Sequence, residues 1–244
     1  MFDVDVRGRG DEDLVLLYGT PVVTESLEPI PEEFGDDYRV VIPKTAGIGI
    51  GPEEALGRLE ETLADVGVEN PRVLGHSLGA YRALQLALSD SFEVDRIALI
   101  GPLTALPDER QVQYDELADG LEAGELDLVE TALEFWFRPE YVDQHPEICE
   151  EVERWFDEIG DEALAAALRN EMQMPDLLPR LDDITTPTCI LVGDCDVGTP
   201  PEWSEEIAET LPDSRLHIIQ NSGHFPHFER PEVTVKILRG FLMN

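Results

Sequence analysis

Lysine is almost absent from this sequence. Lys44 and Lys236 are the only two lysines among 244 residues, and 53 Asp and Glu residues stand against 17 Lys and Arg residues, which gives a formal net charge of -36. Proteins that bind nucleic acids or anionic membrane surfaces gather Lys and Arg on one face. Because no such basic cluster is visible, we expect neither a nucleic-acid partner nor a membrane partner.

Long apolar runs are missing as well. No stretch approaches the eighteen or so consecutive apolar residues of a membrane-spanning helix. The first ten residues, MFDVDVRGRG, lack the apolar core of a secretory signal peptide. The sequence therefore predicts a cytoplasmic protein.

Metal-binding and cofactor-binding patterns are also scarce. The three cysteines are odd in number and form no C-x-x-C pair, which argues against a disulfide framework and a thiolate zinc site. His224 and His227 are spaced as H-x-x-H, but no acidic or cysteine ligand lies at a zinc-like spacing from them. The glycine-rich loop at residues 47–52 lacks the Lys-Ser/Thr ending of a P-loop, so we interpret it as a turn. We predict no metal and no cofactor.

Acidic residues are abundant on a chain that can still fold. Apolar residues make up 42% of the sequence, so the acidity does not indicate disorder. Scarce lysine with abundant Asp and Glu resembles the proteins of salt-accumulating halophiles, in which salt screens the repulsion between surface charges. We interpret the acidic residues as a solvated shell.

Short apolar runs alternate with helical patterns over most of the chain. Runs of strand length cover residues 14–17, 39–42, 72–74, 97–100, 188–192 and 216–219, and helical patterns cover residues 52–66, 78–88, 202–210 and 231–242. Continuous apolar strands are typical of a parallel sheet that is covered on both faces. The alternation predicts an α/β fold with a doubly wound, mostly parallel sheet.

The alternation breaks after Gly101. The pattern is helical from residue 104 to residue 183, and a block of this size between two strands cannot belong to the sheet. We predict a helical cap at residues 104–183, seated over the carboxyl ends of the strands and inserted into a core formed by residues 1–103 and 184–244. The alternative is a helical bundle with no role in substrate selection.

The segment GHSLG, residues 75–79, lies between an apolar run and a helical pattern. It satisfies G-x-S-x-G, in which a nucleophilic serine stands on a sharp turn from strand to helix. Ser77 is therefore a candidate nucleophile, and the backbone N–H of Leu78 is a candidate donor to an oxyanion. The alternative is a serine that is kept in a tight turn for its size.

A serine nucleophile needs a base and a carboxylate that holds the base. The segments GDCDVGTPP, residues 193–201, and NSGHFPHFERPE, residues 221–232, each follow an apolar run. They offer Asp194 or Asp196 as the acid and His224 as the base, in the chain order Ser, Asp, His. His227 follows a proline, and we expect it at the pocket or at the surface.

On these motifs the chain resembles the α/β-hydrolase superfamily over nearly its full length. The superfamily pattern G-x-x-D-x-x-x-P aligns its acid with Asp196 rather than with Asp194. The pattern G-H-x-x-x-x-E-x-P aligns its histidine with His224. The resemblance therefore implies a triad of Ser77, Asp196 and His224.

The resemblance also implies a second oxyanion donor, in the loop after residues 14–17. Superfamily members usually carry His-Gly there, whereas this chain has YGTP at residues 18–21. The donor is a backbone N–H, which by position is that of Thr20. The Gly-x-Pro turn is kept, so we expect the oxyanion hole to survive, and we expect the change to Tyr18 to bear on the packing beneath the loop and on the shape of the pocket. Superfamily members usually have a hairpin before this strand, but only the segment FDVDVRG is available here, so we expect the sheet to lack its first edge strand.

The carboxyl-terminal third is most similar to enol-lactone hydrolases and related carboxylesterases, and the segment FWFRPEYVDQHPE resembles their cap. By this likeness Trp136 and Phe137 line the pocket, with Tyr18 and His76 as further candidates. The alternative for the two adjacent aromatic residues is the core of the cap itself. If the substrate is an anion, local arginines such as Arg138 or Arg169 would decide its binding.

The resemblance implies a serine hydrolase that cleaves a small carboxylic ester or lactone through an acyl-enzyme intermediate. Proteins with the same fold and triad also act as ligand receptors, or cleave carbon–carbon bonds as hydrolases or lyases, and the sequence leaves these alternatives open. The expected partner is a small-molecule substrate, and the expected assembly is a monomer or a homodimer.

Overall fold

The computed structural model describes residues 1–19, 23–45, 50–124 and 128–243. Among these residues, seven strands form one sheet in the order β1-β3-β2-β4-β5-β6-β7. The strands are β1 (Val4–Gly8), β2 (Glu12–Leu17), β3 (Tyr38–Pro43), β4 (Arg72–His76), β5 (Arg96–Ile100), β6 (Thr188–Gly193) and β7 (Ser214–Ile219). β1 runs antiparallel to β3, and the other pairings are parallel. The predicted α/β fold with a mostly parallel sheet is confirmed.

A single strand precedes β2 in the described part of the chain. β1 pairs with β3 along its whole length, from Val4 opposite Pro43 to Gly8 opposite Arg39. Among the described residues, one strand and not a hairpin therefore precedes β2, in agreement with the expected loss of the first edge strand. Five residues are enough because an antiparallel edge strand forms its ladder with one neighbour only and needs no hairpin partner of its own.

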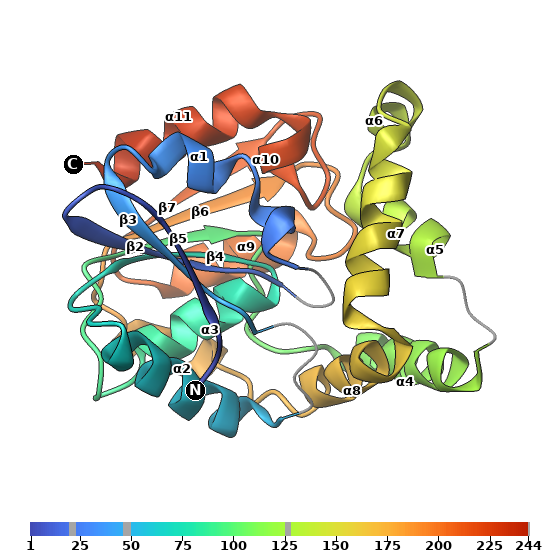
Figure 1. Ribbon diagram of the computed structural model, residues 1–244, viewed down its shortest axis with the longest axis horizontal. Coiled ribbons are helices and arrows are strands. Elements are labelled where there is room, and N and C mark those ends of the chain that lie inside the picture. The colour runs from blue at the N-terminus through green and yellow to red at the C-terminus, as the bar shows by residue number, and fades with distance from the viewer. Residues whose placement is uncertain (20–22, 46–49, 125–127, 244) are drawn as a thin grey trace.

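Helices cover both faces of the sheet (Figure 1). One face carries α1 (Ile30–Phe34), α10 (Pro226–Glu229) and α11 (Pro231–Leu242), and the other carries α2 (Pro52–Asp65), α3 (Leu78–Ala87) and α9 (Pro201–Thr210). Side chains of β2 alternate between the two layers. Leu14 and Leu16 belong to the cluster of α1 and α11, whereas Val15 and Leu17 belong to the cluster of α2, α3 and α9. Burial on both faces explains why the strands read as continuous apolar runs.

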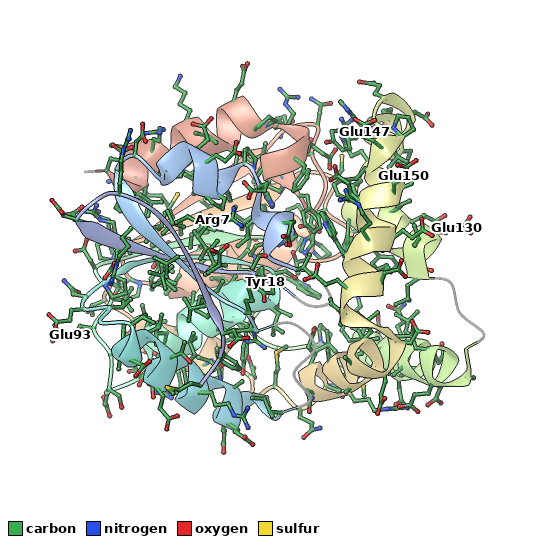
Figure 2. The ribbon with its side chains drawn as sticks, viewed as in Figure 1. Arg7, Tyr18, Glu93, Glu130, Glu147 and Glu150 are labelled. Atoms are coloured by element: carbon green, nitrogen blue, oxygen red, sulfur yellow. The ribbon has the colours of Figure 1, made fainter. Side chains whose placement is uncertain are left out.

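Between β5 and β6 the chain leaves the sheet. We call residues 104–183 the helical insertion. Its described part contains α4 (Asp108–Ala123), α5 (Leu128–Trp136), α6 (Pro139–Gln144), α7 (Glu147–Ile159), α8 (Asp161–Glu171) and the 3-10 helix η2 (Leu178–Asp183). Figure 1 shows α4 to α8 gathered beside one end of the sheet. The exposed acidic side chain of Glu130 lies on the outer side of the helical insertion, and that of Glu147 is exposed at the beginning of α7 (Figure 2).

Three further observations concern the described residues. None of their helices combines the length and the apolar character that crossing a membrane requires. The three cysteines, all within the described ranges, form no disulfide. A further 3-10 helix, η1 (Thr24–Leu27), connects β2 to α1.

Candidate active site

Ser77 stands on the turn between β4 and α3. Its backbone has φ 56° and ψ -122°, a conformation that is strained for a residue with a side chain. The N–H of Ser77 donates to the carbonyl of Ile100 at 2.9 Å, and the carbonyl of Ser77 accepts from the N–H groups of Ala80 and Tyr81. The neighbouring strand and the first turn of α3 therefore hold this conformation in place, as in a nucleophile elbow.

Glycines make this turn possible. A Cβ on Gly75 would lie 2.3 Å from the carbonyl oxygen of Gly79, and a Cβ on Gly79 would lie 2.0 Å from the carbonyl oxygen of Leu17. Both gaps are far too short for a side chain, so the turn requires glycine at both positions. A Cβ on Gly19 would lie 2.8 Å from the Cβ of Ser77. The loop after β2 thus begins directly beside the serine.

This arrangement also places one of the predicted oxyanion donors. Leu78 is the first residue of α3, so its N–H has no acceptor within the helix and lies at the positive end of the helix dipole. Thr20, the second predicted donor, lies outside the described residues.

His224 and Asp196 form a buried pair. Nδ1 of His224 lies 2.8 Å from Oδ2 of Asp196, and the exposed fractions of the two side chains are 4% and 0%. Asp194, the competing acid, is exposed, and its Oδ1 accepts from the N–H of Ser222 at 3.2 Å. The fold therefore brings Asp196 to the histidine and leaves Asp194 on the outside of the same loop.

Thr199 is a site residue that the sequence analysis did not identify. Its backbone N–H donates to Oδ1 of Asp196 at 2.8 Å, and its hydroxyl lies 3.0 Å from Oδ2 of Asp196 and 3.2 Å from Nδ1 of His224. Because the hydroxyl has one proton, it donates to Asp196 and is free to accept from the Nδ1–H of His224. Turns in which an aspartate accepts from a nearby backbone N–H are common, so the D-x-x-T spacing was an available signal.

Contacts with the helical insertion fix the loop that carries His224. The N–H of His224 donates to the carbonyl of Trp136 at 2.8 Å. Oε1 of Glu229 accepts from the N–H of Gly223 at 2.7 Å, and Oε2 accepts from Nε of Arg138 at 3.0 Å. Burial raises the pKa of Glu229, while the Gly223 N–H and the Arg138 guanidinium oppose that rise. The histidine loop and the helical insertion are therefore one hydrogen-bonded unit.

A cavity of about 420 Å³ lies between the sheet and the helical insertion. The core supplies Ser77, Leu103, Gly198, Thr199, Trp203 and His224 to its wall, and the helical insertion supplies Leu106, Arg110, Gln113, Tyr114, Glu116, Leu117, Leu128, Thr131, Ala132, Phe135, Trp136, Phe156, Leu168 and Glu171. A largely apolar wall with a few polar groups is typical of small-molecule sites, and the volume suits a small substrate.

Of the four side chains expected to line the pocket, Trp136 does so. Phe137 faces away and stacks on Tyr141 and Phe225, with ring centroids 5.6 and 5.0 Å apart. Consecutive positions near the end of a helix point in different directions, so one aromatic residue faces the cavity while the other joins the core. Tyr18 is buried and lines a separate cavity together with Lys44.

His76 and His227 do not line the cavity. The ring of His76 packs between those of His224 and His227, with centroids 4.7 and 5.2 Å apart. Nε2 of His76 donates to the carbonyl of His224 at 2.9 Å, and Nε2 of His227 donates to the carbonyl of Ser26 at 2.7 Å. Burial, reinforced by the neighbouring imidazoles, lowers the pKa of His76 well below its usual value and that of His227 to about 4. The expectation that His227 lies at the pocket or the surface is wrong, because the short helix α10 turns it inward.

The titratable side chains do not gather into a metal site in the part of the chain that the structure describes. There, no group of three or more His, Cys, Asp or Glu side chains is arranged to hold a metal ion.

Comparisons with known proteins agree with this architecture. The sequence model of the alpha/beta hydrolase family matches residues 16–237. A 2-hydroxy-6-oxononadienedioate/2-hydroxy-6-oxononatrienedioate hydrolase from Pseudomonas putida is 26% identical, over 97% of this chain and 90% of that protein. An esterase from Thermogutta terrifontis has a TM-score of 0.90 at 24% identity, with 99% of this chain and 93% of the other covered. The enol-lactonase from Burkholderia xenovorans LB400 has a TM-score of 0.89 at 19% identity, with 100% and 96% covered. At these identities the two structures support the fold alone.

Proposed function

The chain belongs to the alpha/beta hydrolase family, and we propose that it acts as a serine hydrolase on a small carboxylic ester or lactone. One observation carries this proposal: Ser77 shares its cavity with His224, whose Nδ1 lies 2.8 Å from Asp196. In this proposal Ser77 is the nucleophile, His224 is the general base, and Asp196 orients the histidine.

The proposed reaction follows from this arrangement. Asp196 accepts a hydrogen bond from the Nδ1–H of His224, so the proton stays on Nδ1 and Nε2 is the basic nitrogen. Nε2 takes the proton of Ser77 while Oγ forms a bond to the carbonyl carbon, and the carbonyl electron pair moves onto oxygen. The N–H of Leu78 donates to that oxyanion, an interaction worth about 10²- to 10³-fold in rate. The ester C–O bond then breaks, and the departing alkoxide takes the proton from Nε2.

Water completes the cycle in the second half of the reaction. His224 removes a proton from water, the hydroxide adds to the acyl carbon, and the bond to Ser77 Oγ breaks with return of the proton to the serine. The helical insertion would act as a cap in both halves, because its side chains form most of the cavity wall that keeps bulk water from the acyl group.

The Pseudomonas putida relative favours a second candidate function. Its substrate, as named, carries a ketone and two carboxylates and no ester bond. Hydrolysis of a carbon–carbon bond beside a ketone would use the same Ser77, His224 and Asp196. A protein that binds one ligand tightly and turns it over slowly is the remaining alternative for the same cavity.

Covalent labelling tests the nucleophile directly. A fluorophosphonate should label the wild-type protein once, at Ser77, because only a serine activated by a base attacks phosphorus at a useful rate. Ser77→Ala and His224→Ala should not be labelled. Asp194→Asn is the matched control in the same region and should be labelled normally. Labelling that persists in Ser77→Ala would contradict the proposal.

Turnover separates the candidate functions. The panel contains p-nitrophenyl esters of rising chain length, lactones, and ketones that are open to carbon–carbon cleavage, each assayed at low and high salt. The proposal predicts ester or lactone turnover that falls by on the order of 10⁶ in Ser77→Ala. Cleavage of the ketones alone would favour the second candidate, and labelling without turnover of any compound would favour a ligand-binding role.

A further inference from the structure

Arg110 brings a positive charge to the cavity wall. Among the described residues that line the cavity, it is the sole Lys or Arg. It stands in the first turn of α4, where the helix dipole is unfavourable for a cation. Helix stability therefore gives no reason for an arginine at this position.

The guanidinium of Arg110 is held in place without being neutralised. Nη2 donates to the carbonyl of Val197 at 2.5 Å, Nη1 lies 3.2 Å from Oε1 of Gln113, and the group lies over the ring of Phe135 at 4.8 Å. These three partners are uncharged. Within the described ranges, Arg110 takes part in no ion pair. An arginine has five N–H donors, so donors remain for a ligand.

The arginines considered from the sequence are engaged elsewhere. Arg138 pairs with Glu229 and Glu140, and its role is to tie the helical insertion to the histidine loop. Arg169 pairs with three carboxylates of α4, which are exposed on the outer surface. The chain has 53 acidic and 17 basic residues. Even so, Arg110, which lines the cavity, forms no ion pair with a carboxylate among the described residues.

Two carboxylates share the cavity wall, and neither faces Arg110 as an ion-pair partner. Glu116 is exposed to solvent. Glu171 is buried and lines a second, small cavity together with Arg82. The charge of Glu171 counteracts the burial that lowers the pKa of Arg82. Arg82 thus places a positive charge near Glu171 in that second cavity.

A polar but uncharged group lies in the same wall. Burial, assisted by the charge of Glu171, raises the pKa of Tyr114, and Arg110 opposes that rise. The Tyr114 hydroxyl therefore stays protonated across the physiological range and can donate to an oxygen of the ligand. Both Arg110 and Tyr114 belong to α4, so one helix presents both donors to the cavity.

Resting on the proposed function, we propose that Arg110 binds a free carboxylate of the substrate, so that the preferred substrate is an ester or lactone with one negative charge. The planar guanidinium matches the geometry of a carboxylate. A singly charged carboxylate suits the site better than a dianionic phosphate because Glu116 and Glu171 share the wall. The net charge of the protein repels anions at long range, but at contact the local arginine decides.

Binding to an inactive variant tests this inference apart from catalysis. Monomethyl esters of linear dicarboxylic acids from succinate to suberate are titrated into Ser77→Ala, each beside its neutral dimethyl ester. Quenching of Trp136 and Trp203 fluorescence reports binding, because both rings line the cavity. We expect the best monoanion to bind more tightly than its diester. Adding Arg110→Met should weaken that monoanion about 10- to 100-fold and change the diester by less than about twofold.

Two further variants make the comparison specific. Arg110→Lys should retain part of the preference for the monoanion over the diester, because lysine keeps the positive charge but lacks the planar guanidinium that binds both carboxylate oxygens. Arg154→Met changes the net charge equally, on an exposed side chain of α7 that pairs with Glu151, and should change neither ligand. Equal weakening of both ligands in a folded Arg110→Met protein would make Arg110 a structural link between α4 and the loop after β6. That result, unchanged monoanion binding, or no binding by any monoester would overturn the inference.

Turnover by the protein with Ser77 intact keeps the two proposals apart. If neither ester type is hydrolysed while monoanion binding still depends on Arg110, the proposed function fails and the carboxylate site stands. If both are hydrolysed with equal efficiency in the presence and absence of Arg110, the proposed function stands and the carboxylate site fails.

Discussion

The sheet and the helical insertion build the same cavity under opposite constraints. On the sheet side, the turns that carry Ser77 and His224 are packed against backbone, so that a Cβ on Gly79 would lie 2.0 Å from a carbonyl oxygen. On the insertion side, a Cβ on Gly124, which ends α4, would meet nothing within 4 Å. The turn that carries Ser77 therefore has no space for a larger side chain at Gly79, whereas the surface of the insertion has space for one at Gly124.

The two regions also differ in charge. Residues 104–183 are about a third of the chain, yet they carry 24 of the 53 acidic residues and 5 of the 17 basic residues. The insertion nevertheless supplies most of the cavity wall. If the proposed function holds, substrate selection would therefore depend on the region with the higher density of negative charge.

The largest effect should come from the acid on the sheet side. Asp196→Asn should lower ester turnover by roughly 10⁴, because an amide stabilises the wrong tautomer of His224. Asp194→Asn should cost less than about tenfold, since Asp194 contacts the N–H of Ser222 and not the histidine. Steady-state kinetics of both variants on one activated ester measure the difference. Equal losses, or a larger loss at Asp194, would reverse the roles of the two residues.

Matched glycine substitutions test the difference in tolerance. Gly79→Ala should destabilise the fold by more than about 3 kcal/mol or prevent folding, because the new methyl group collides with backbone that cannot move away. Gly124→Ala should cost about 1 kcal/mol, the penalty for φ 67° alone. Urea denaturation of the two purified variants provides the comparison. A mild Gly79→Ala variant would mean that the elbow is less constrained than its geometry indicates.

The buried histidines of the core should make stability depend on pH. Unfolded His227 takes up a proton near pH 6.5, whereas the folded pKa is about 4, so the unfolded state binds more protons between these values. Its contribution is complete above pH 6.5 and declines as the pH falls toward 4, by on the order of 3 kcal/mol.

His227→Gln should flatten this decline in urea denaturation profiles from pH 7 to pH 4, since glutamine keeps a donor for the Ser26 carbonyl without titrating. His145→Gln is the control in the insertion, where the histidine is exposed on its side chain to 45%. A slope that His227→Gln leaves intact would assign the pH dependence to other groups.

Salt should stabilise the protein through its surface charge. Raising the salt concentration from 0.15 to 1 M shortens the screening length from about 8 Å to about 3 Å, which weakens repulsion among the acidic side chains. A gain of about 2 kcal/mol would raise the thermal midpoint by about 4–8 °C. Midpoints measured in a KCl series provide the check. A flat or falling series would rule out the resemblance to halophilic proteins as a guide to stability.

The smallest effect concerns the residue between the acid and the base. Thr199→Val removes the hydroxyl that contacts Asp196 and His224 and keeps the backbone N–H bond to Asp196. Turnover should fall about tenfold, the cost of one hydrogen bond to a charged group. Thr199→Ser keeps the hydroxyl and should stay within about threefold of wild type. If Thr199→Ser turns over no faster than Thr199→Val, the side chain of Thr199 contributes packing and does not position Asp196 and His224.

The sequence by itself determined the order and type of most elements. The predicted helix over residues 231–242 matches α11 (Pro231–Leu242), and the six expected strands match β2 to β7 with small extensions. These features are local, because apolar periodicity and strand-to-helix turns depend on neighbouring residues. The motif register also named Asp196 and His224, which the fold brings within 2.8 Å of each other.

Tertiary structure alone decided which side chains face the cavity. Trp136 and Phe137 are adjacent in sequence, yet Trp136 lines the cavity whereas Phe137 does not and stacks on Tyr141. His76 precedes Ser77 and still points to the carbonyl of a residue 148 positions away. Arg110 reaches the carbonyl of Val197 across 87 positions. Such contacts depend on how the helical insertion is seated on the sheet, and no local pattern in the sequence encodes the direction of one side chain relative to a distant loop.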